Sequence, residues 1–129
     1  MSTNLISIFE QYVSGWKRAE IETVLETLDE DCIITECYGP VYRGRDNVRL
    51  WMEKWLGEGN RVLEWDVRTC VIGQDAAAFE WRFKCLWHGE ESGFEGSSIV
   101  QYRNGKILTM REYATTADLY EWTGTWRAH

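Results

Sequence analysis

Proline and histidine are scarce in this sequence, and its cysteines lack the spacing of metal sites. One proline in 129 residues leaves little that could form a linker, and the length supports one domain core rather than two. The two histidines and four cysteines show no C-x-x-C pair and no zinc-ligand spacing. Nucleotide-binding loops and nucleophile motifs are also absent. We predict a single domain over residues 1–129, without metal or cofactor, whose cysteines are free buried thiols (Cys32, Cys37, Cys70 and Cys85).

An excess of positive charge is missing too. Lys and Arg number 14 against 21 Asp and Glu, the formal net charge is -7, and no basic run offers a surface for phosphates. The first apolar stretch is interrupted by Glu10 and Lys17, which suits neither a signal peptide nor a membrane span. These absences argue against nucleic-acid and membrane partners and favour a cytoplasmic protein.

Large apolar side chains are abundant, with eight Trp, six Tyr and four Phe. In the first half of the chain they recur at steps of three and four residues, the period of an amphipathic helix. The pattern predicts three helices, over residues 5–16, 21–28 and 48–56. The acidic run 29–31 is expected to end the second helix, and Gly57 to close the third.

From residue 61 onward the period changes to two, which indicates strands. Residues 61–72 and 76–87 are typical of a hairpin around residues 73–75, and residues 94–102 of a third strand. This register predicts three facing pairs of opposite charge (Glu64 with Lys84, Asp66 with Arg82, and Arg68 with Glu80). The other face carries apolar side chains (Leu63, Trp65, Val67, Phe79, Trp81, Phe83 and Trp87).

A shorter predicted strand, "IITECYG" at residues 33–39, carries a carboxyl group among apolar neighbours. Strand alternation puts Ile34, Glu36 and Tyr38 on one face, where a lone acid is costly. Burial disfavours the charged carboxylate, so its pKa should rise from about 4.3 toward neutrality, where a general acid or base works best. The structural alternative is that Glu36 accepts hydrogen bonds from tryptophan indoles or backbone donors near the strand end.

The sequence "YRNGKI" before the last predicted strand permits two turns. A three-residue loop points Met110 and Glu112 inward, whereas a two-residue turn points Arg111 and Tyr113 inward. The apolar pattern favours the first turn, which places Glu112 opposite Gly96, where a glycine leaves room for it. Two inward carboxyl groups, one ionised and one protonated, would supply both a base and an acid.

Beyond the last strand, the pattern of Asp118, Leu119 and Trp122 predicts a short capped helix. Such a segment can cover the mouth of a pocket. His88 precedes the turn at residues 89–91, which favours an exposed position over a catalytic one.

Helices followed by a long antiparallel sheet predict an α+β domain in which the helices cover one face of the sheet. Four segments, "FEQYVSGW", "LDEDCIITECYG", "YRGRDNV" and "GKILTMREYA", are the markers of a resemblance that covers nearly the whole chain. In them the sequence resembles the nuclear transport factor 2-like superfamily, in particular its SnoaL-like and ketosteroid isomerase-like branches. The resemblance implies a cone-shaped, curved antiparallel sheet whose concave face is covered by three helices.

The resemblance also implies roles for individual residues. In the ketosteroid isomerase-like branch a carboxylate at the position of Glu36 shuttles a proton, and a tyrosine at the position of Tyr12 helps to polarise the substrate oxygen. The second, protonated acid of those isomerases is matched here by Ser98, a neutral and weaker donor. For Tyr12 the structural alternative is a packed core tyrosine with a solvated hydroxyl group.

These observations predict one pocket between helices and sheet. We expect the catalytic residues to be Glu36, Tyr12 and Glu112, and the ligand-binding residues to be Trp16, Tyr38, Trp55, Trp81, Ser98 and Met110. The expected function is cofactor-independent acid–base catalysis, of isomerase, cyclase, dehydratase or hydrolase type, on a small apolar molecule. The alternatives are a non-catalytic domain that binds a small hydrophobic ligand, and a dimerisation module.

The superfamily resemblance further implies a homodimer formed through the outer face of the sheet. That face is expected to carry the charge pairs together with Ile72 and Ile99.

Overall fold

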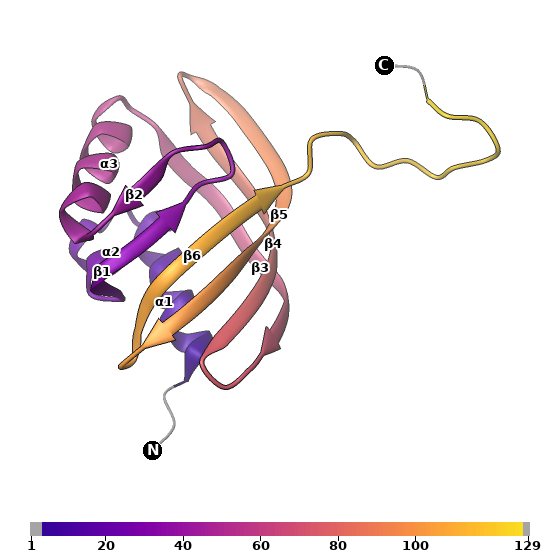
Figure 1. Ribbon diagram of the computed structural model, residues 1–129. Helices are drawn as coiled ribbons and strands as arrows, with labels where there is room; N and C mark the ends of the chain where they lie inside the picture. The colour runs from indigo at the N-terminus through magenta and orange to yellow at the C-terminus, as the bar shows by residue number, and fades with distance from the viewer. Residues whose placement is uncertain (1–3, 128–129) are drawn as a thin grey trace.

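The computed structural model describes residues 4–127, which form a layer of helices against a curved sheet (Figure 1). The helices are α1 (Leu5–Lys17), α2 (Ile21–Leu25) and α3 (Arg45–Gly57). The strands are β1 (Leu28–Thr35), β2 (Val41–Arg43), β3 (Arg61–Ile72), β4 (Ala76–Trp87), β5 (Glu90–Arg103) and β6 (Lys106–Ala114). The α+β class and the three helices in the first half of the chain are confirmed.

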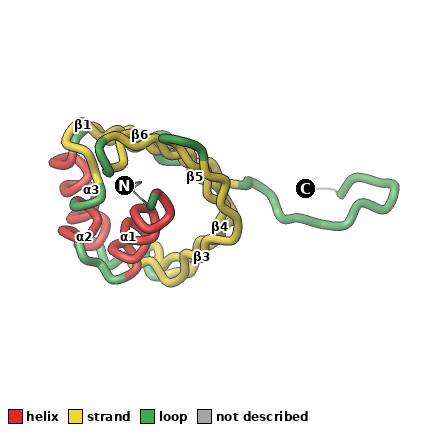
Figure 2. Tube along the Cα trace, turned by 90° about the horizontal axis from the view of Figure 1, so that it is seen from below, coloured by secondary structure: helices red, strands yellow, loops and turns green. Residues whose placement is uncertain are grey.

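The sheet has the strand order β2-β1-β6-β5-β4-β3. Neighbouring strands are antiparallel except for β1 and β6, which are parallel. The sheet is therefore mixed, which corrects the prediction of a purely antiparallel one. Figure 2 shows an open arc of strands with α1 lying inside it and with α2 and α3 on the open side. This arrangement turns the inner face of the sheet toward the helices.

Helix α1 supplies much of the core. Its N-cap Asn4 accepts hydrogen bonds through its side-chain oxygen from the backbone N–H groups of Ile6 and Ser7, at 3.0 and 3.2 Å. One face of the helix is buried, including Phe9, whose ring stacks on Phe79 of β4 at 4.0 Å between centroids. The period of three and four residues therefore identified the face of α1 that meets the sheet.

The second helix is shorter than predicted, because it ends at Leu25 and the acidic run belongs to β1. Asp29 is 9% exposed, yet its carboxylate accepts two hydrogen bonds from the Arg103 guanidinium, at 2.7 and 3.1 Å. The Arg103 guanidinium lowers the pKa of Asp29 by stabilising the charged form. Arg103, which lies far from Asp29 in the sequence but contacts it in the fold, thus allows an acidic residue to occupy a largely buried strand position.

The β3–β4 hairpin has the predicted bounds, and two of the predicted charge pairs are confirmed (Glu64 with Lys84 and Asp66 with Arg82). The third is wrong, because a bulge after Val67 brings Thr69 rather than Arg68 opposite Glu80. The bulge also places Val71 opposite Ala78 on the outer face, and so turns Ile72 toward the inner one. A second bulge, between Val62 and Glu64, leaves Leu63 43% exposed instead of in the core.

The last hairpin combines features of both predicted turns. Its turn is the two-residue one, with Asn104 and Gly105 both at positive φ, 52° and 75°. That turn alone would point Arg111 and Tyr113 inward. Leu108, however, has no partner on β5 and forms a bulge, which shifts the following residues of β6 by one position. Met110 and Glu112 therefore point inward as predicted, although the residues that face them are Val100 and Ser98.

Gly96 leaves room for Trp81 rather than for Glu112. A Cβ atom added at Gly96 would lie 2.7 Å from Cη2 of Trp81 and would also meet the carbonyl oxygen of Tyr113. We expect Gly96→Ala to lower the free energy of unfolding by about 1 to 3 kcal/mol, because these neighbours would have to move. The matched control is Gly57→Ala at the end of α3, where nothing lies within 4 Å of the added atom. Equal urea midpoints for the two variants would contradict this prediction.

The segment after β6 is not a helix. Residues 115–127 lack regular secondary structure and run away from the body of the domain (Figure 1). The prediction of a short helix around Asp118 is therefore wrong. His88 is exposed as expected, and its backbone N–H donates to Oδ1 of Asn60 at 2.9 Å.

Among residues 4–127, no helix is both long and apolar enough to cross a membrane. Nor do three or more His, Cys, Asp or Glu side chains gather as metal ligands within those residues. The four cysteines are free, but only Cys32 and Cys85 are buried, Cys37 is half-buried and Cys70 is exposed.

Candidate active site

A cavity of about 670 Å³ lies between the helices and the concave face of the sheet. This volume suits a small organic molecule. Seven of the nine residues predicted to form the pocket line it (Tyr12, Trp16, Glu36, Tyr38, Trp55, Trp81 and Glu112). Ser98 and Met110 are not among its lining residues and are fully buried.

Two aromatic walls enclose the cavity. The wall on the helix side consists of rings from α1, β2 and α3 (Trp16, Tyr42, Trp51 and Trp55), with centroid separations of 4.0 to 5.7 Å between neighbours. The wall on the sheet side consists of rings from β3, β4 and β5 (Trp65, Trp81, Phe83 and Phe94). Aromatic faces of this kind favour flat or apolar ligands.

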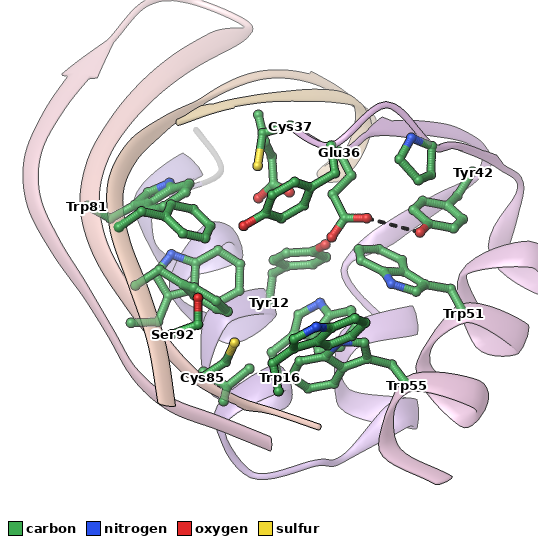
Figure 3. A pocket seen from close by; sticks show the side chains of 18 of the residues that line it. Tyr12, Trp16, Glu36, Cys37, Tyr42, Trp51, Trp55, Trp81, Cys85 and Ser92 are labelled. Atoms are coloured by element: carbon green, nitrogen blue, oxygen red, sulfur yellow. Dashed lines mark hydrogen bonds between the residues drawn. The ribbon is translucent and has the colours of Figure 1, made fainter. Parts of the chain in front are cut away.

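Glu36 follows directly after β1, at the start of a tight turn. Its backbone N–H donates to the carbonyl of Pro40 at 2.9 Å, and its own carbonyl accepts from the N–H of Gly39 at 3.0 Å. The turn continues the inward direction of Ile34, so the carboxyl group enters the cavity beneath the loop (Figure 3). Tyr38, predicted to lie in the strand, belongs to this turn and is 70% exposed at the mouth.

Tyr42 positions the carboxyl group of Glu36. Its hydroxyl donates a hydrogen bond to Oε1 of Glu36 at 3.1 Å, and its ring stacks on Trp51 at 4.0 Å with an interplanar angle of 4° (Figure 3). Sequence reasoning missed Tyr42. The signal available was the Gly39-Pro40 turn followed by "VYR", which is a hairpin pattern that returns an aromatic residue to the neighbourhood of Glu36.

Burial raises the pKa of Glu36, and the hydrogen bond from Tyr42 lowers it in part. We therefore expect Tyr42→Phe to raise the pKa of Glu36 further, since the charged form loses a donor. A ¹³C NMR titration of the glutamate carboxyl carbons, with Glu36→Gln to assign the resonance, measures the change. An unchanged or lowered pKa would mean that Tyr42 does not stabilise the carboxylate.

Glu112 reaches the same cavity from β6. Burial and the nearby charge of Glu36 raise the pKa of Glu112 to about 8, while a hydrogen bond with Ser98 opposes the rise. Ser98 faces Glu112 across the strand pair, and its hydroxyl oxygen accepts the indole N–H of Trp81 at 3.0 Å. The two carboxyl groups titrate as a coupled pair, and the raised pKa of Glu112 favours its protonated form at neutral pH.

The hydroxyl of Tyr12 lines the cavity with no partner in good hydrogen-bond geometry among the described residues, although the Trp16 side chain lies near enough to oppose the rise of its pKa. Figure 3 shows the Tyr12 ring at the centre of the pocket, with its hydroxyl end toward Glu36. Burial and the charge of Glu112 raise the pKa of Tyr12 well above its ordinary value, so the hydroxyl keeps its proton. A buried, unpaired donor in a pocket is costly unless a ligand accepts its hydrogen bond.

The remaining polar groups of the cavity suit other roles. Cys37 is no thiolate nucleophile at neutral pH, because burial raises its pKa to about 11. Lys54 and Glu58 form an ion pair at 3.1 Å across one turn of α3, where both line the cavity and are largely exposed. The interior thus offers carboxyl groups and a phenol, which can move protons and donate hydrogen bonds.

Comparisons with known proteins agree with this architecture. A family model described as "SnoaL-like domain" matches residues 9–110. No curated protein sequence matches significantly. Similar solved structures include an LEH-like epoxide hydrolase of M. tuberculosis, at 15% identity over 85% of this chain and 81% of that one, with a TM-score of 0.77.

Two further solved structures show the same fold. A candidate polyketide cyclase of Xanthomonas campestris pv. campestris is 16% identical over 84% of this chain and 87% of that one, with a TM-score of 0.70. A protein of Catenulispora acidiphila with a ketosteroid isomerase-like fold, in complex with trimethylamine, is 14% identical over 87% of this chain and 86% of that one, with a TM-score of 0.72. At identities this low, the similarity supports a shared fold but not a shared activity.

Proposed function

Because the chain belongs to the SnoaL-like domain family, we propose that it is a cofactor-independent acid–base enzyme acting on a small apolar molecule in the central cavity. The observation that carries the proposal is the convergence of Glu36, Glu112 and the unpaired Tyr12 hydroxyl on one aromatic-walled cavity. Burial raises the pKa of all three groups, and the charge of Glu36 raises the pKa of Glu112 further, which is the electrostatic pattern of acid–base sites.

The division of roles follows from the environments of the two acids. Glu36 is half-buried and holds a donor from Tyr42, so it ionises first and acts as the base. It removes a proton from a carbon next to a carbonyl group; the electron pair of that C–H bond forms a carbon–carbon double bond, and the π pair of the carbonyl moves onto its oxygen. The protonated Glu112 and Tyr12 donate hydrogen bonds to this oxygen as its charge develops. The proton on Glu36 then returns to another atom of the substrate, which restores the enzyme.

Exchange of carbon-bound protons tests the proposal without knowledge of the natural substrate. A panel of cyclic ketones and unsaturated lactones is incubated with the protein in D₂O, and loss of the α-proton signals is followed by ¹H NMR. We expect exchange above the buffer rate for the members that bind. Binding of several members, seen as a change in tryptophan fluorescence, with no exchange in any of them would contradict the enzyme and favour a binding domain.

The second candidate is a non-catalytic domain that binds a small ligand. The aromatic wall beside Glu36 favours it, since rings next to a carboxylate attract substituted ammonium ions. The trimethylamine bound by the similar structure from Catenulispora acidiphila is consistent with such a ligand. A cation that binds far more tightly than its neutral carbon isostere, for example benzyltrimethylammonium against neopentylbenzene, would support this candidate.

We also propose that two copies of the chain associate through the outer face of the sheet. A second proposal is that the protein resides in a reducing compartment such as the cytoplasm. The outer face carries Val71, Ile99 and Tyr113, which are 65%, 50% and 48% exposed. Side chains of this size on one sheet face are typical of a contact surface. The four free cysteines are compatible with reducing conditions.

A further inference from the structure

Residues 115–127, named here the arm, leave the domain without packing onto it. The arm is anchored at Thr115, whose backbone N–H and hydroxyl both donate to the carbonyl of Glu95, at 2.9 and 3.1 Å. Beyond this anchor it runs outward and doubles back as a hook (Figures 1 and 2). A hollow of about 890 Å³ separates the arm from residues of β4 and β5.

The arm carries large apolar side chains that its own domain does not cover. Leu119, Trp122 and Trp126 are 76%, 54% and 80% exposed. Burying such side chains is worth roughly 1.5 to 3 kcal/mol each, so their exposure in an isolated chain is unfavourable. A segment of this kind is stable in solution once another surface covers it.

Contacts within the arm give it a defined shape before it binds. The rings of Trp122 and Trp126 lie 5.3 Å apart. The hydroxyl of Tyr120 accepts the backbone N–H of Arg127 at 3.1 Å, and the guanidinium of Arg127 lies over the Tyr120 ring at 4.3 Å from its centroid. Because these contacts already restrict the arm, it loses less conformational entropy when it docks.

A complementary surface exists on the outer face of the sheet. Strand pairing aligns Val71, Ala78, Ile99 and Arg111 in one row across β3, β4, β5 and β6, and Tyr113 lies beside this row. We call these five residues the outer-face patch. No described residue forms an ion pair with Arg111, whose guanidinium lies over the ring of Tyr113 at 5.9 Å from its centroid. The arm supplies carboxylates at Asp118 and Glu121 that can pair with such a cation.

We propose that the arm of each copy of this chain docks on the outer-face patch of a second copy, so that two copies exchange arms. The occupant is a second copy because a two-fold assembly repeats every contact: an arm laid between the two outer faces covers its own apolar side chains together with the partner's patch, and its carboxylates can pair with Arg111. The exchange rests on the proposed assembly through the outer face.

Two variants separate arm exchange from simple face-to-face pairing. The first lacks residues 117–129 and keeps the patch; the second, Ile99→Glu, keeps the arm and places a charge in the patch. Sedimentation velocity at micromolar concentration is expected to show the full chain at twice the 15.2 kDa mass of one chain. Each variant alone is expected to be mostly monomeric. Leu63→Glu, at an exposed apolar position outside the patch, is the matched control and should remain dimeric.

Mixing the two variants gives the decisive measurement. The truncated chain offers an intact patch and Ile99→Glu offers an intact arm, so a mixture should form heterodimers that neither variant forms alone. Circular dichroism confirms that both variants are folded. A truncated chain that dimerises as well as the full chain would overturn arm exchange and leave the assembly through the outer face standing. A monomeric full chain, or a mixture without heterodimers, would overturn the exchange.

Discussion

Replacing Glu36 with glutamine is expected to reduce turnover by about 10²-fold or more while ligand affinity changes little. Glutamine keeps the size of the side chain and its ability to accept the hydrogen bond from Tyr42, but it cannot take up a proton. The loss should therefore fall on the chemical step. The α-proton exchange assay gives the rate, and tryptophan fluorescence gives the affinity for the same ketone or lactone.

The melting temperature of Glu36→Gln separates a catalytic from a structural carboxylate. Burial raises the pKa of Glu36, so its ionised form is less stable in the folded protein than in the unfolded chain. Removing the charge should leave the melting temperature unchanged or raise it. Glu53→Gln, on the exposed side of α3, serves as the control and should alter neither rate nor melting temperature. A clear destabilisation by Glu36→Gln without any effect on the exchange rate would contradict the proposed catalytic role and favour a structural role for the carboxylate.

Glu112→Gln is expected to remove most of the dependence of stability on pH between mildly acidic and mildly alkaline conditions. The pKa of Glu112 is raised from its ordinary 4.5 to about 8 in the folded protein, which therefore holds a proton that the unfolded chain releases. The stability contributed by this proton is fully present below the unfolded pKa and is lost as pH rises through the folded pKa. Each pH unit within the window lowers the free energy of unfolding by up to about 1.4 kcal/mol.

Thermal or urea unfolding at about pH 5 and about pH 9 measures this effect without any substrate. The wild type should lose considerably more stability across the interval than Glu112→Gln, whose side chain is neutral throughout. The exchange rate supplies a second readout, since the wild-type rate should fall as Glu112 loses its proton and ceases to donate to the substrate oxygen. Parallel stability profiles for the two proteins would show that Glu112 is not protonated in the fold.

Much of the architecture follows from patterns that lie within single elements. The period of two from residue 61 predicted the bounds of β3 and β4, and two charge pairs between them were correct. The helical period identified the buried face of α1 with Tyr12 and Trp16. These patterns are readable because side-chain direction repeats with a fixed period inside a strand or a helix. The prediction that Glu112 points inward was correct, but the structure achieves it through the bulge at Leu108 and not through the predicted turn.

Features that depend on how elements pack against one another were missed. The bulges at Leu63, Arg68 and Leu108 change which residues face inward, and nothing local marks them, because a bulge is selected by the fit of a whole strand to its neighbours. The hydrogen bond from Tyr42 to Glu36 likewise requires β2 to pair beside β1.

The sequence by itself determined an α+β domain with its main helices and strands, and it predicted a pocket with two carboxyl groups and a tyrosine. Composition and periodicity carry this information since each residue contributes to it locally. Only the tertiary structure decided that β1 and β6 run parallel, that Ser98 faces Glu112 from behind the cavity wall, and that residues 115–127 project as an arm. Each of these depends on whether residues distant in the chain contact one another. Contacts of that kind leave no periodic pattern in the sequence.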